Sequence, residues 1–142
     1  MKNIKDCPFC NILKDEREIL SETKYSFVIL SNPALISGHC LAIPKRHIEK
    51  LSELTKRELF DLIEHTTLFQ NKLLTKYGGC DIRQNYRPFQ KQDGFKVNHL
   101  HIHLQPMEFK DGLYKKCQIY ESLCWKTLTK PQLKKMGDFI LK

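Results

Sequence analysis

The sequence has no long apolar run. Its first residues, MKNIKDCPFC, lack the continuous hydrophobic segment of a signal peptide, and no later stretch approaches the roughly 20 apolar residues of a membrane-spanning helix. We therefore expect a cytoplasmic protein with no membrane partner. In such a reducing compartment, the six cysteines are better explained as free thiols or metal ligands than as disulfides.

Internal repeats, low-complexity tracts and linkers are absent as well. With 142 residues, the chain is expected to form one domain, 1–142, that is large enough to bury a core without disulfides. Hydrophobic residues make up 41% of the sequence and charged residues 28%, and this balance is typical of a globular protein.

An arginine-rich cluster interleaved with aromatic residues is also missing, although the net charge is +8. The excess charge is concentrated in residues 110–142, which contain eight lysines against three acidic residues. A basic balance favours anionic partners such as phosphates, nucleotides or nucleic acid. Without the arginine and aromatic cluster, a solvated lysine-rich surface explains the charge better than a nucleic-acid interface, so no nucleic-acid partner is expected.

Three histidines alternate in the stretch NHLHIHLQP, residues 98–106. Successive side chains of a β-strand point to opposite faces, so these histidines would share one face: His99, His101 and His103. The apolar residues between and after them would share the other face and enter the core: Leu100, Ile102 and Leu104. A polar face exposed to water is the simpler alternative. Imidazole is a nucleophile, a general base and a metal ligand, so the row favours a functional site.

The remaining pattern predicts an α+β fold. Strands are predicted at 25–30, 39–44, 80–86 and 96–106. A long helix is predicted for 55–77, where Thr55 and Glu58 form a T-x-x-E capping box. Residues 129–141 resemble a short amphipathic C-terminal helix. Strands around one long helix favour a mainly antiparallel sheet of about five strands.

Spacing alone leaves two chemistries open for the histidine row. Three imidazoles can hold a catalytic metal, as they do in some zinc hydrolases. One imidazole can instead act as a nucleophile in phosphoryl or nucleotidyl transfer while its neighbours handle the charge.

The residues around the row resemble one known family. HLHIHL matches the H-x-H-x-H-x pattern of the histidine triad (HIT) superfamily of nucleotide hydrolases and transferases. The upstream stretch SNPALISGHCLAIPKRH is similar to the family's N-P…G-H-x-L-x-I-P-K-R-H segment, and CPFCNIL resembles the C-x-F-C-K-I opening of its zinc-containing bacterial-type members. The resemblance covers residues 7–106 and leaves 107–142 as a basic C-terminal extension.

The resemblance implies a covalent mechanism. His101 would attack the α-phosphorus of a nucleotide substrate, such as a dinucleoside polyphosphate or a nucleoside phosphoramidate, and water would then release the nucleotide from the histidine. His103 would bind the phosphate or assist the leaving group. His39 would lie beside the triad, with a purely structural histidine as the alternative. Asn85 matches an asparagine of the family's phosphate site.

The resemblance also implies a structural zinc ion. Cys7 and Cys10 offer two thiolates, but zinc takes four ligands and the chain has no second C-x-x-C. By the resemblance, the other two ligands are His47 and His99. The alternative, a thioredoxin-type redox pair, lacks its usual βαβ context.

Two departures from the family pattern concern the nucleotide. Leu30 stands where the family commonly has an acidic residue that holds the ribose, so Ser31 or Asn32 would take that role. Lys96 stands where a hydroxyl residue usually precedes the triad, so a cation would replace the hydroxyl beside the phosphate.

The stretch YRPFQKQD, between Asn85 and Gly94, is longer than usual and contains Arg87 and Lys91. These two cations either hold a highly charged substrate or belong to a solvated loop.

Three functions stay open from the sequence. The leading hypothesis is a nucleotide hydrolase or transferase, and the alternatives are a zinc-stabilised nucleotide-binding protein with little turnover and a basic nucleic-acid-binding module. Members of the family are often homodimers that pack through the long helix, so a homodimer is expected as well.

Overall fold

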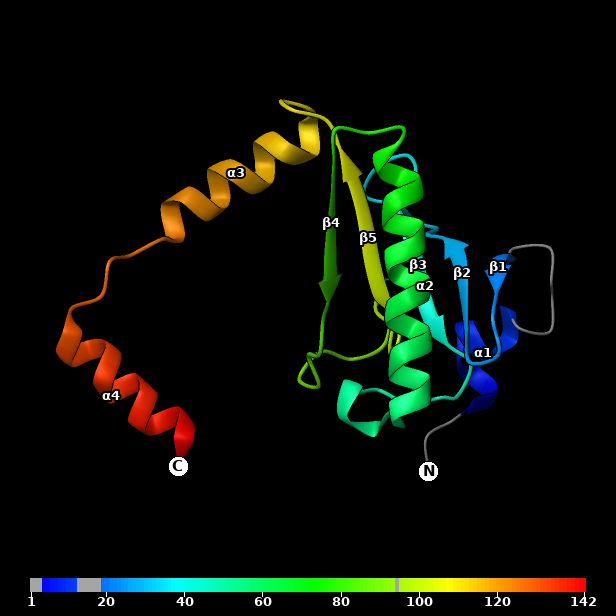
Figure 1. Cartoon of the computed structure of the whole chain (residues 1–142), viewed down its shortest axis with the longest axis horizontal. Helices are drawn as coiled ribbons and strands as arrows, with labels where there is room; N and C mark the ends of the chain where they lie inside the picture. The colour runs from blue at the N-terminus through cyan, green and yellow to red at the C-terminus, as the bar shows by residue number, and fades with distance from the viewer. Residues whose placement is uncertain (1–3, 13–18, 94) are drawn as a thin grey trace.

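Five antiparallel strands form one sheet in the order β1-β2-β3-β5-β4 (Figure 1). The computed structural model describes residues 4–12, 19–93 and 95–142, apart from the side chains of 117–120, so Gly94 and the side chain of Cys117 lie outside the described residues. The strands are β1 Ile19–Glu22, β2 Ser26–Leu30, β3 Cys40–Pro44, β4 Gly79–Gln84 and β5 Ile102–Met107. The expected α+β fold with an antiparallel sheet is confirmed.

The long helix α2, Lys56–Leu74, packs on one face of the sheet (Figure 1). Its predicted capping box is confirmed, because the Thr55 hydroxyl accepts a hydrogen bond from the Glu58 amide and the Glu58 carboxylate accepts one from the Thr55 amide. The helix buries Leu62, Phe69 and Leu73 against apolar side chains of the sheet and of the segment before β5. Those partners are Val28, Ala42, Leu100, Ile102 and Leu104.

The opposite face of the sheet meets the short helix α1, Pro8–Ile12. Phe27 of β2 and Ile43 of β3 alternate with the residues that face α2, and they pack against Cys7 and Phe9. The predicted alternation along β5 is also present, since Ile102 and Leu104 are buried against α2 while His103 lies on the opposite face and lines a pocket. The face under α2 is therefore apolar core, whereas the opposite face is divided between an apolar cluster against α1 and the pocket that His103 lines.

The predicted strand 96–106 starts later than expected, because β5 begins at Ile102. The amide of Leu100 donates to the carbonyl of Ile48 at 2.6 Å, and the amide of Asn98 donates to the side chain of Gln92 at 3.0 Å. These bonds take the backbone of residues 98–100 out of the sheet. His99 and His101 consequently precede the strand, and only His103 lies within it.

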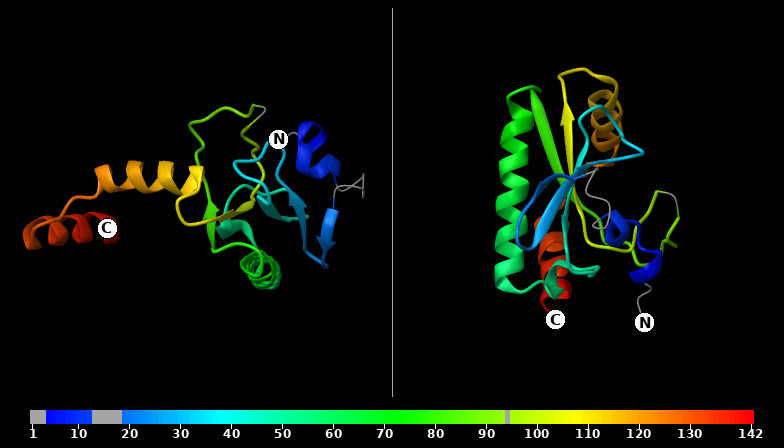
Figure 2. Two further views of the ribbon diagram at one scale, coloured as in Figure 1. Left: turned by 90° about the horizontal axis from the view of Figure 1, so that it is seen from above. Right: turned by 90° about the vertical axis from the view of Figure 1, so that its right-hand side faces the viewer.

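The extension after β5 contains two helices, α3 Gly112–Cys124 and α4 Lys130–Leu141. The predicted helix 129–141 is confirmed as α4, with Thr129 as its N-cap. Helix α3 was not predicted from the sequence, and Asp111 caps it through the amide of Tyr114. Figures 1 and 2 show both helices projecting away from the sheet as an arm. The arm exposes large apolar side chains: Leu123, Trp125, Leu133, Met136, Phe139, Ile140 and Leu141.

Strand β1 and helix α1 were not predicted individually from the sequence. Within the described residues, no helix combines the length and the apolar character needed to cross a membrane.

Candidate active site and metal centre

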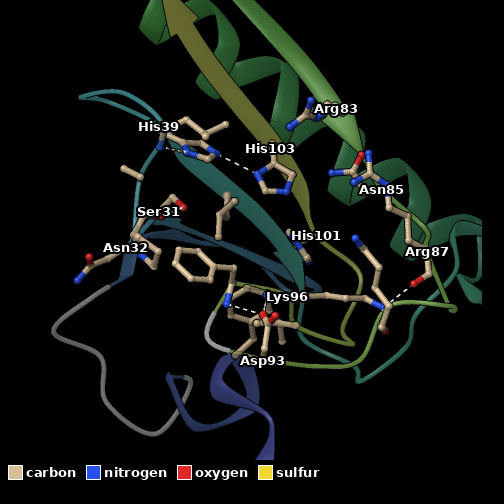
Figure 3. Close-up of a pocket in the computed structure, with 18 of the residues that line it drawn as sticks. Ser31, Asn32, His39, Arg83, Asn85, Arg87, Asp93, Lys96, His101 and His103 are labelled. Carbon is tan, nitrogen blue, oxygen red and sulfur yellow. Dashed lines mark hydrogen bonds between the residues drawn. The ribbon is translucent and has the colours of Figure 1, made fainter. Parts of the chain in front are cut away.

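A pocket of about 640 Å³ opens on the face of the sheet opposite α2 (Figure 3). Its walls come from three parts of the chain: the loop between β2 and β3 together with the start of β3, the segment from β4 to β5, and α1. The volume is in the range of a small-molecule site. Three of the predicted catalytic residues, His39, His101 and His103, line it together.

One hydrogen bond of His101 determines which of its ring nitrogens carries the proton and which one can act as a base in the pocket. Its Nδ1 atom lies 2.6 Å from the carbonyl oxygen of His99, so Nδ1–H donates there. The lone pair of Nε2 is left for the pocket. Burial lowers the pKa of His101, against an opposing effect of the same carbonyl, and this favours the neutral imidazole.

His39 and His103 are joined by a chain of hydrogen bonds, and this chain gives His103 the protonation opposite to that of His101. The Leu35 amide donates to Nδ1 of His39 at 3.2 Å, so Nε2–H of His39 donates to Nδ1 of His103 at 2.9 Å. His103 therefore carries its proton on Nε2 and offers an N–H donor. Burial, and next the charge of Arg83, lowers the pKa of His39 to about 4, while burial and neighbouring charges lower the pKa of His103 to about 3.

Lys96 lines the pocket, but its ammonium group holds the loop that precedes β5. It donates to the carbonyl oxygens of Arg87 and Gln90. The Asp93 carboxylate accepts hydrogen bonds from the amides of Phe95 and Lys96, each at 2.7 Å. These bonds close the loop on itself, so Lys96 shapes the wall of the pocket.

The expected polar contacts for a nucleotide lie on both sides of the pocket (Figure 3). Ser31 and Asn32 are on one side, where the Ser31 hydroxyl donates to the carbonyl of Pro33 at 2.8 Å. Asn85 is on the other side, after β4. Leu30 does not contribute to the lining and is 54% exposed at the end of β2.

Sequence reasoning missed Arg83, which also lines the pocket. This residue lies in β4 directly opposite His103 of β5. It precedes Asn85 by two positions, and the period of two in a strand was the signal that could have found it. Arg87 and Lys91 line the same pocket, so the loop cations face the site rather than only solvent.

The four predicted metal ligands come together beside the pocket. One ligand atom from each of Cys7, Cys10, His47 and His99 lies within 4.8 Å of all the others. Nδ1 of His99 is 3.3 Å from Sγ of Cys7 and 3.6 Å from Sγ of Cys10, and Nδ1 of His47 is 3.3 Å from Sγ of Cys10. A tetrahedral zinc ion with its usual bond lengths separates a nitrogen and a sulfur ligand by about 3.6 Å.

The orientation of His99 also fits a metal ligand. Its Nε2–H donates to the carbonyl oxygen of Pro44 at 2.9 Å, which leaves the Nδ1 lone pair directed at the cysteines. Such a carbonyl partner is typical of metal-bound histidines. Two thiols and two imidazoles form the donor set of many structural zinc sites, so the residues present fit this ion.

The fold and the pocket describe a small α+β protein with a row of neutral imidazoles in a polar, cationic cavity. The HIT domain model matches residues 13–110, and the chain therefore belongs to the HIT domain family.

Several of its curated relatives are named as enzymes of nucleotide chemistry. The chain is 34% identical over 110 residues to an adenosine 5′-monophosphoramidase of Saccharomyces cerevisiae, covering 75% of this chain and 66% of the yeast protein. It is 30% identical over 112 residues to a bis(5′-adenosyl)-triphosphatase of Dictyostelium discoideum, covering 76% and 71% of the two chains.

Solved structures share the fold over nearly the whole chain. A HIT family protein from Bacillus anthracis matches with a TM-score of 0.70 at 21% identity, over 96% of this chain and 95% of the other. A histidine triad nucleotide-binding protein from Candida albicans matches with a TM-score of 0.62 at 25% identity, over 92% and 99%. The first match includes the C-terminal arm in its coverage.

Proposed function

We propose that the chain is a HIT-type enzyme that hydrolyses or transfers nucleotides by cleavage at the α-phosphate, with His101 as the nucleophile. The observation that carries this proposal is the opposite protonation of two neighbouring rings. His101 presents the lone pair of Nε2, whereas His103 presents Nε2–H. Their ring centroids lie 4.8 Å apart, so one phosphate group can meet both.

The reaction takes two steps. First, Nε2 of His101 bonds to the α-phosphorus, and the bond from phosphorus to the leaving group breaks, with its electron pair on the leaving group. His103 donates a hydrogen bond to a phosphate oxygen, whose charge grows in the transition state. Second, a water oxygen bonds to phosphorus and the P–N bond breaks, which releases the nucleoside monophosphate and restores His101.

The rest of the pocket supports a nucleotide of this kind. Phe9, Leu41 and Val97 give it an apolar side suited to a nucleobase. Asn32 and Ser31 are suited to the ribose, and Asn85 to the phosphate. Lys96 supports the phosphate site through the loop that it closes.

We also propose that Cys7, Cys10, His47 and His99 hold one structural Zn²⁺. The ion would join the N-terminal segment to the chain just before β5, and the reaction needs no step at the metal. Cysteines that bind a metal must stay reduced, so the proposal includes a reducing, cytoplasmic compartment for the protein.

A homodimer and a single domain over 1–142 complete the proposal. The outer face of α2 exposes three apolar residues within its first two turns: Leu59, Phe60 and Ile63, of which Phe60 is 66% exposed. An apolar patch of this kind on a helix supports burial against a second copy. The basic C-terminal arm belongs to the same unit, with its own apolar residues available to the dimer.

A substrate panel tests the enzymatic proposal. The wild-type chain is incubated with diadenosine triphosphate and adenosine 5′-phosphoramidate, products are separated, and the protein is analysed by mass spectrometry for bound nucleotide. We expect release of AMP and a protein mass increased by one nucleotidyl group on His101. Nucleotide affinity without AMP release would favour the binding protein with little turnover, and salt-dependent binding of oligonucleotides alone would favour the nucleic-acid module.

A further inference from the structure

The pocket has two unlike sides. Phe9, Leu35 and Val97 are among the residues of its apolar part, whereas all of its arginine and lysine residues come from β4 and the loop that follows it. Those cations are Arg83, Arg87, Lys91 and Lys96. Figure 3 shows Arg83, Asn85 and Arg87 along one side, next to His103, with Ser31 and Asn32 across the pocket. The positive charge of the pocket therefore lies on β4 and its following loop, and Arg83 is the cation opposite His103.

Arg83 differs from Arg87 and Lys91 in its position and from Lys96 in its partners. It is the Cα partner of His103 in the β4–β5 ladder, whereas Arg87 and Lys91 lie on the loop that follows. Within the described part of the chain, its guanidinium forms no hydrogen bond or ion pair. Lys96, by contrast, gives its ammonium group to loop carbonyls. A rigid strand thus presents a guanidinium with all its donors available next to the reaction centre.

Arg83 also carries a fixed positive charge on this side of the nucleophile (Figure 3). The pKa of His39 is lowered to about 4, with burial first and Arg83 second among the causes, and the pKa of His103 is lowered to about 3 by burial and then by surrounding charges that include Arg83. Both rings of the free site are therefore neutral near pH 7, while a guanidinium stays charged. Neutral imidazoles cannot balance a leaving group that departs as an anion, but an arginine beside them can.

We propose that Arg83 binds the leaving group and selects nucleotides whose leaving group is itself an oxyanion, such as a chain of further phosphates. This inference rests on the proposed function and names the substrate class for the same site. When the His101–phosphorus bond forms, the bond from phosphorus to the bridging oxygen breaks, and the electron pair stays on that oxygen. The guanidinium meets this negative charge, so no proton transfer to the leaving group is needed. Water then cleaves the P–N bond, the nucleoside monophosphate leaves, and one proton goes to solvent.

A leaving group without negative charge gains little from Arg83. An amine released from a phosphoramidate departs neutral after protonation, so a nearby guanidinium does not stabilise it. If Arg83 acts on the leaving group, its loss should affect only the substrate with an anionic leaving group. If it has a general role in the pocket, its loss should affect both substrates. Arg83 could recognise the phosphate chain itself or the second nucleoside at its end. Comparing diadenosine triphosphate with inorganic tripolyphosphate, which has the chain but no nucleoside and is used as a competing ligand, distinguishes the two.

The test measures kcat/KM of the full chain for diadenosine triphosphate and for adenosine 5′-phosphoramidate. For Arg83→Ala and Arg83→Gln, we expect a loss of about 10- to 100-fold with the first substrate and a change below about threefold with the second. Arg83→Lys should recover part of the loss, because it keeps the charge without the planar fork. Arg57→Ala, which removes an exposed arginine of α2 outside the pocket, serves as the matched control. Equal losses with both substrates, or no loss with either, would overturn the inference.

A second experiment measures binding alone, so that the role of Arg83 can be tested without turnover. In the His101→Asn background, the dissociation constants of diadenosine triphosphate, tripolyphosphate and AMP are measured by calorimetry. Adding Arg83→Ala should weaken binding of the two polyphosphates about tenfold or more and leave AMP within about twofold. If the wild-type chain hydrolyses no nucleotide but this pattern holds, the proposed function fails and the role of Arg83 stands as a polyphosphate contact. Equal weakening of all three ligands would reject it.

Discussion

The ring of Phe9 meets the ring of His101 edge-on, with their centroids 5.2 Å apart. Phe9 lies between the two cysteines of the metal cluster, and it makes a similar contact with His99 at 5.8 Å. The ring of Phe9 therefore contacts both a ligand of the proposed zinc site and the proposed nucleophile. Any change that releases α1 from the cluster also removes a neighbour of the reactive histidine.

Loss of the two thiolates should affect both metal content and stability. For the double variant Cys7→Ser, Cys10→Ser, we expect the loss of about one equivalent of zinc and a lower melting temperature, because a metal that binds only the folded state stabilises it. Elemental analysis and thermal denaturation measure the two effects. Cys124→Ser, which removes an exposed thiol from α3, is the control. Unchanged melting of the double variant, or zinc-free wild-type protein purified without chelator, would contradict the assignment.

Replacement of His101 by Asn should separate chemistry from binding. The side chain lies in the pocket and not in the core against α2, so the fold should survive. Turnover should fall by about 10⁴-fold or more, as in other enzymes that lose a covalent nucleophile, while nucleotide binding stays. His103→Asn should react more slowly but still form the covalent intermediate. Nucleotide labelling, with circular dichroism as the folding check, decides the matter, and near wild-type hydrolysis by folded His101→Asn would reject the nucleophile.

Gly38 should tolerate no side chain. Its φ is +86°, and a Cβ atom there would lie 2.6 Å from the Oη atom of Tyr77, whose hydroxyl donates to the carbonyl of Ser37. Gly38→Ala should therefore cost about 1–3 kcal/mol of unfolding free energy and displace the adjacent His39, which lowers activity as well. Urea denaturation and steady-state kinetics measure these effects. Gly137→Ala is the control, since a Cβ at that position of α4 meets no atom within 4 Å.

The stability of the protein should fall on acidification partly through His65 of α2. Its Nδ1 lies 2.8 Å from the Ser26 hydroxyl, which donates to Asp61 at 2.7 Å, and its Nε2 lies 2.9 Å from the Ser21 hydroxyl. Burial lowers the pKa of His65 from 6.5, against an opposing effect of Asp61. The folded state therefore binds fewer protons than the unfolded state below pH 6.5, so stability is complete above that pH and declines as pH falls.

Unfolding in urea at several pH values between 7.5 and 5 measures this dependence. His65→Gln should reduce the slope of unfolding free energy against pH by up to about 1.4 kcal/mol per pH unit, because one titrating group is removed. An unchanged slope in a folded variant would show that His65 does not contribute.

The oligomeric state should respond to the exposed face of α2. We expect wild-type protein to sediment as a dimer at micromolar concentration, and Phe60→Lys to shift it toward the monomer, since a charge on a buried apolar patch is costly. Arg57→Ala, one turn away and outside the apolar patch, is the control. A single 16.8 kDa species for the wild-type chain would reject the dimer.

The elements that could be predicted from the sequence are those with a local signal. Helix α2 was marked by its capping box, and strands β2 and β3 by runs of β-forming residues ended by Asn32 and Pro44. Strand β1 and helix α1 are four and five residues long, too short for a period to stand out. The start of β5 was misplaced because its limit depends on the bond from the Leu100 amide to the Ile48 carbonyl, which no local pattern reveals.

The features of the site also divide into those that could be predicted from the sequence and those that required the structure. The four residues of the metal cluster were predicted and are brought together by the fold, and His39 does lie beside His103. The opposite protonation of His101 and His103 depends on backbone partners contributed by His99 and Leu35, so it required the structure. Lys96 was expected to stand beside the phosphate, and that role stays a prediction. Its ammonium group donates to the carbonyls of Arg87 and Gln90, and no local pattern in the sequence reveals these contacts.

The long separation between Cys7 and His99 has a consequence during synthesis of the chain. The two residues lie 92 positions apart and meet only when the segment before β5 has been made. At about 5–20 residues per second, the cysteines leave the ribosome roughly 5 to 20 seconds before their histidine partner. Over that interval the nascent chain carries an unliganded dithiol at its leading end, open to oxidants and to other metal ions. Loading of the proposed metal site should therefore depend on the redox state and the metal supply around the ribosome.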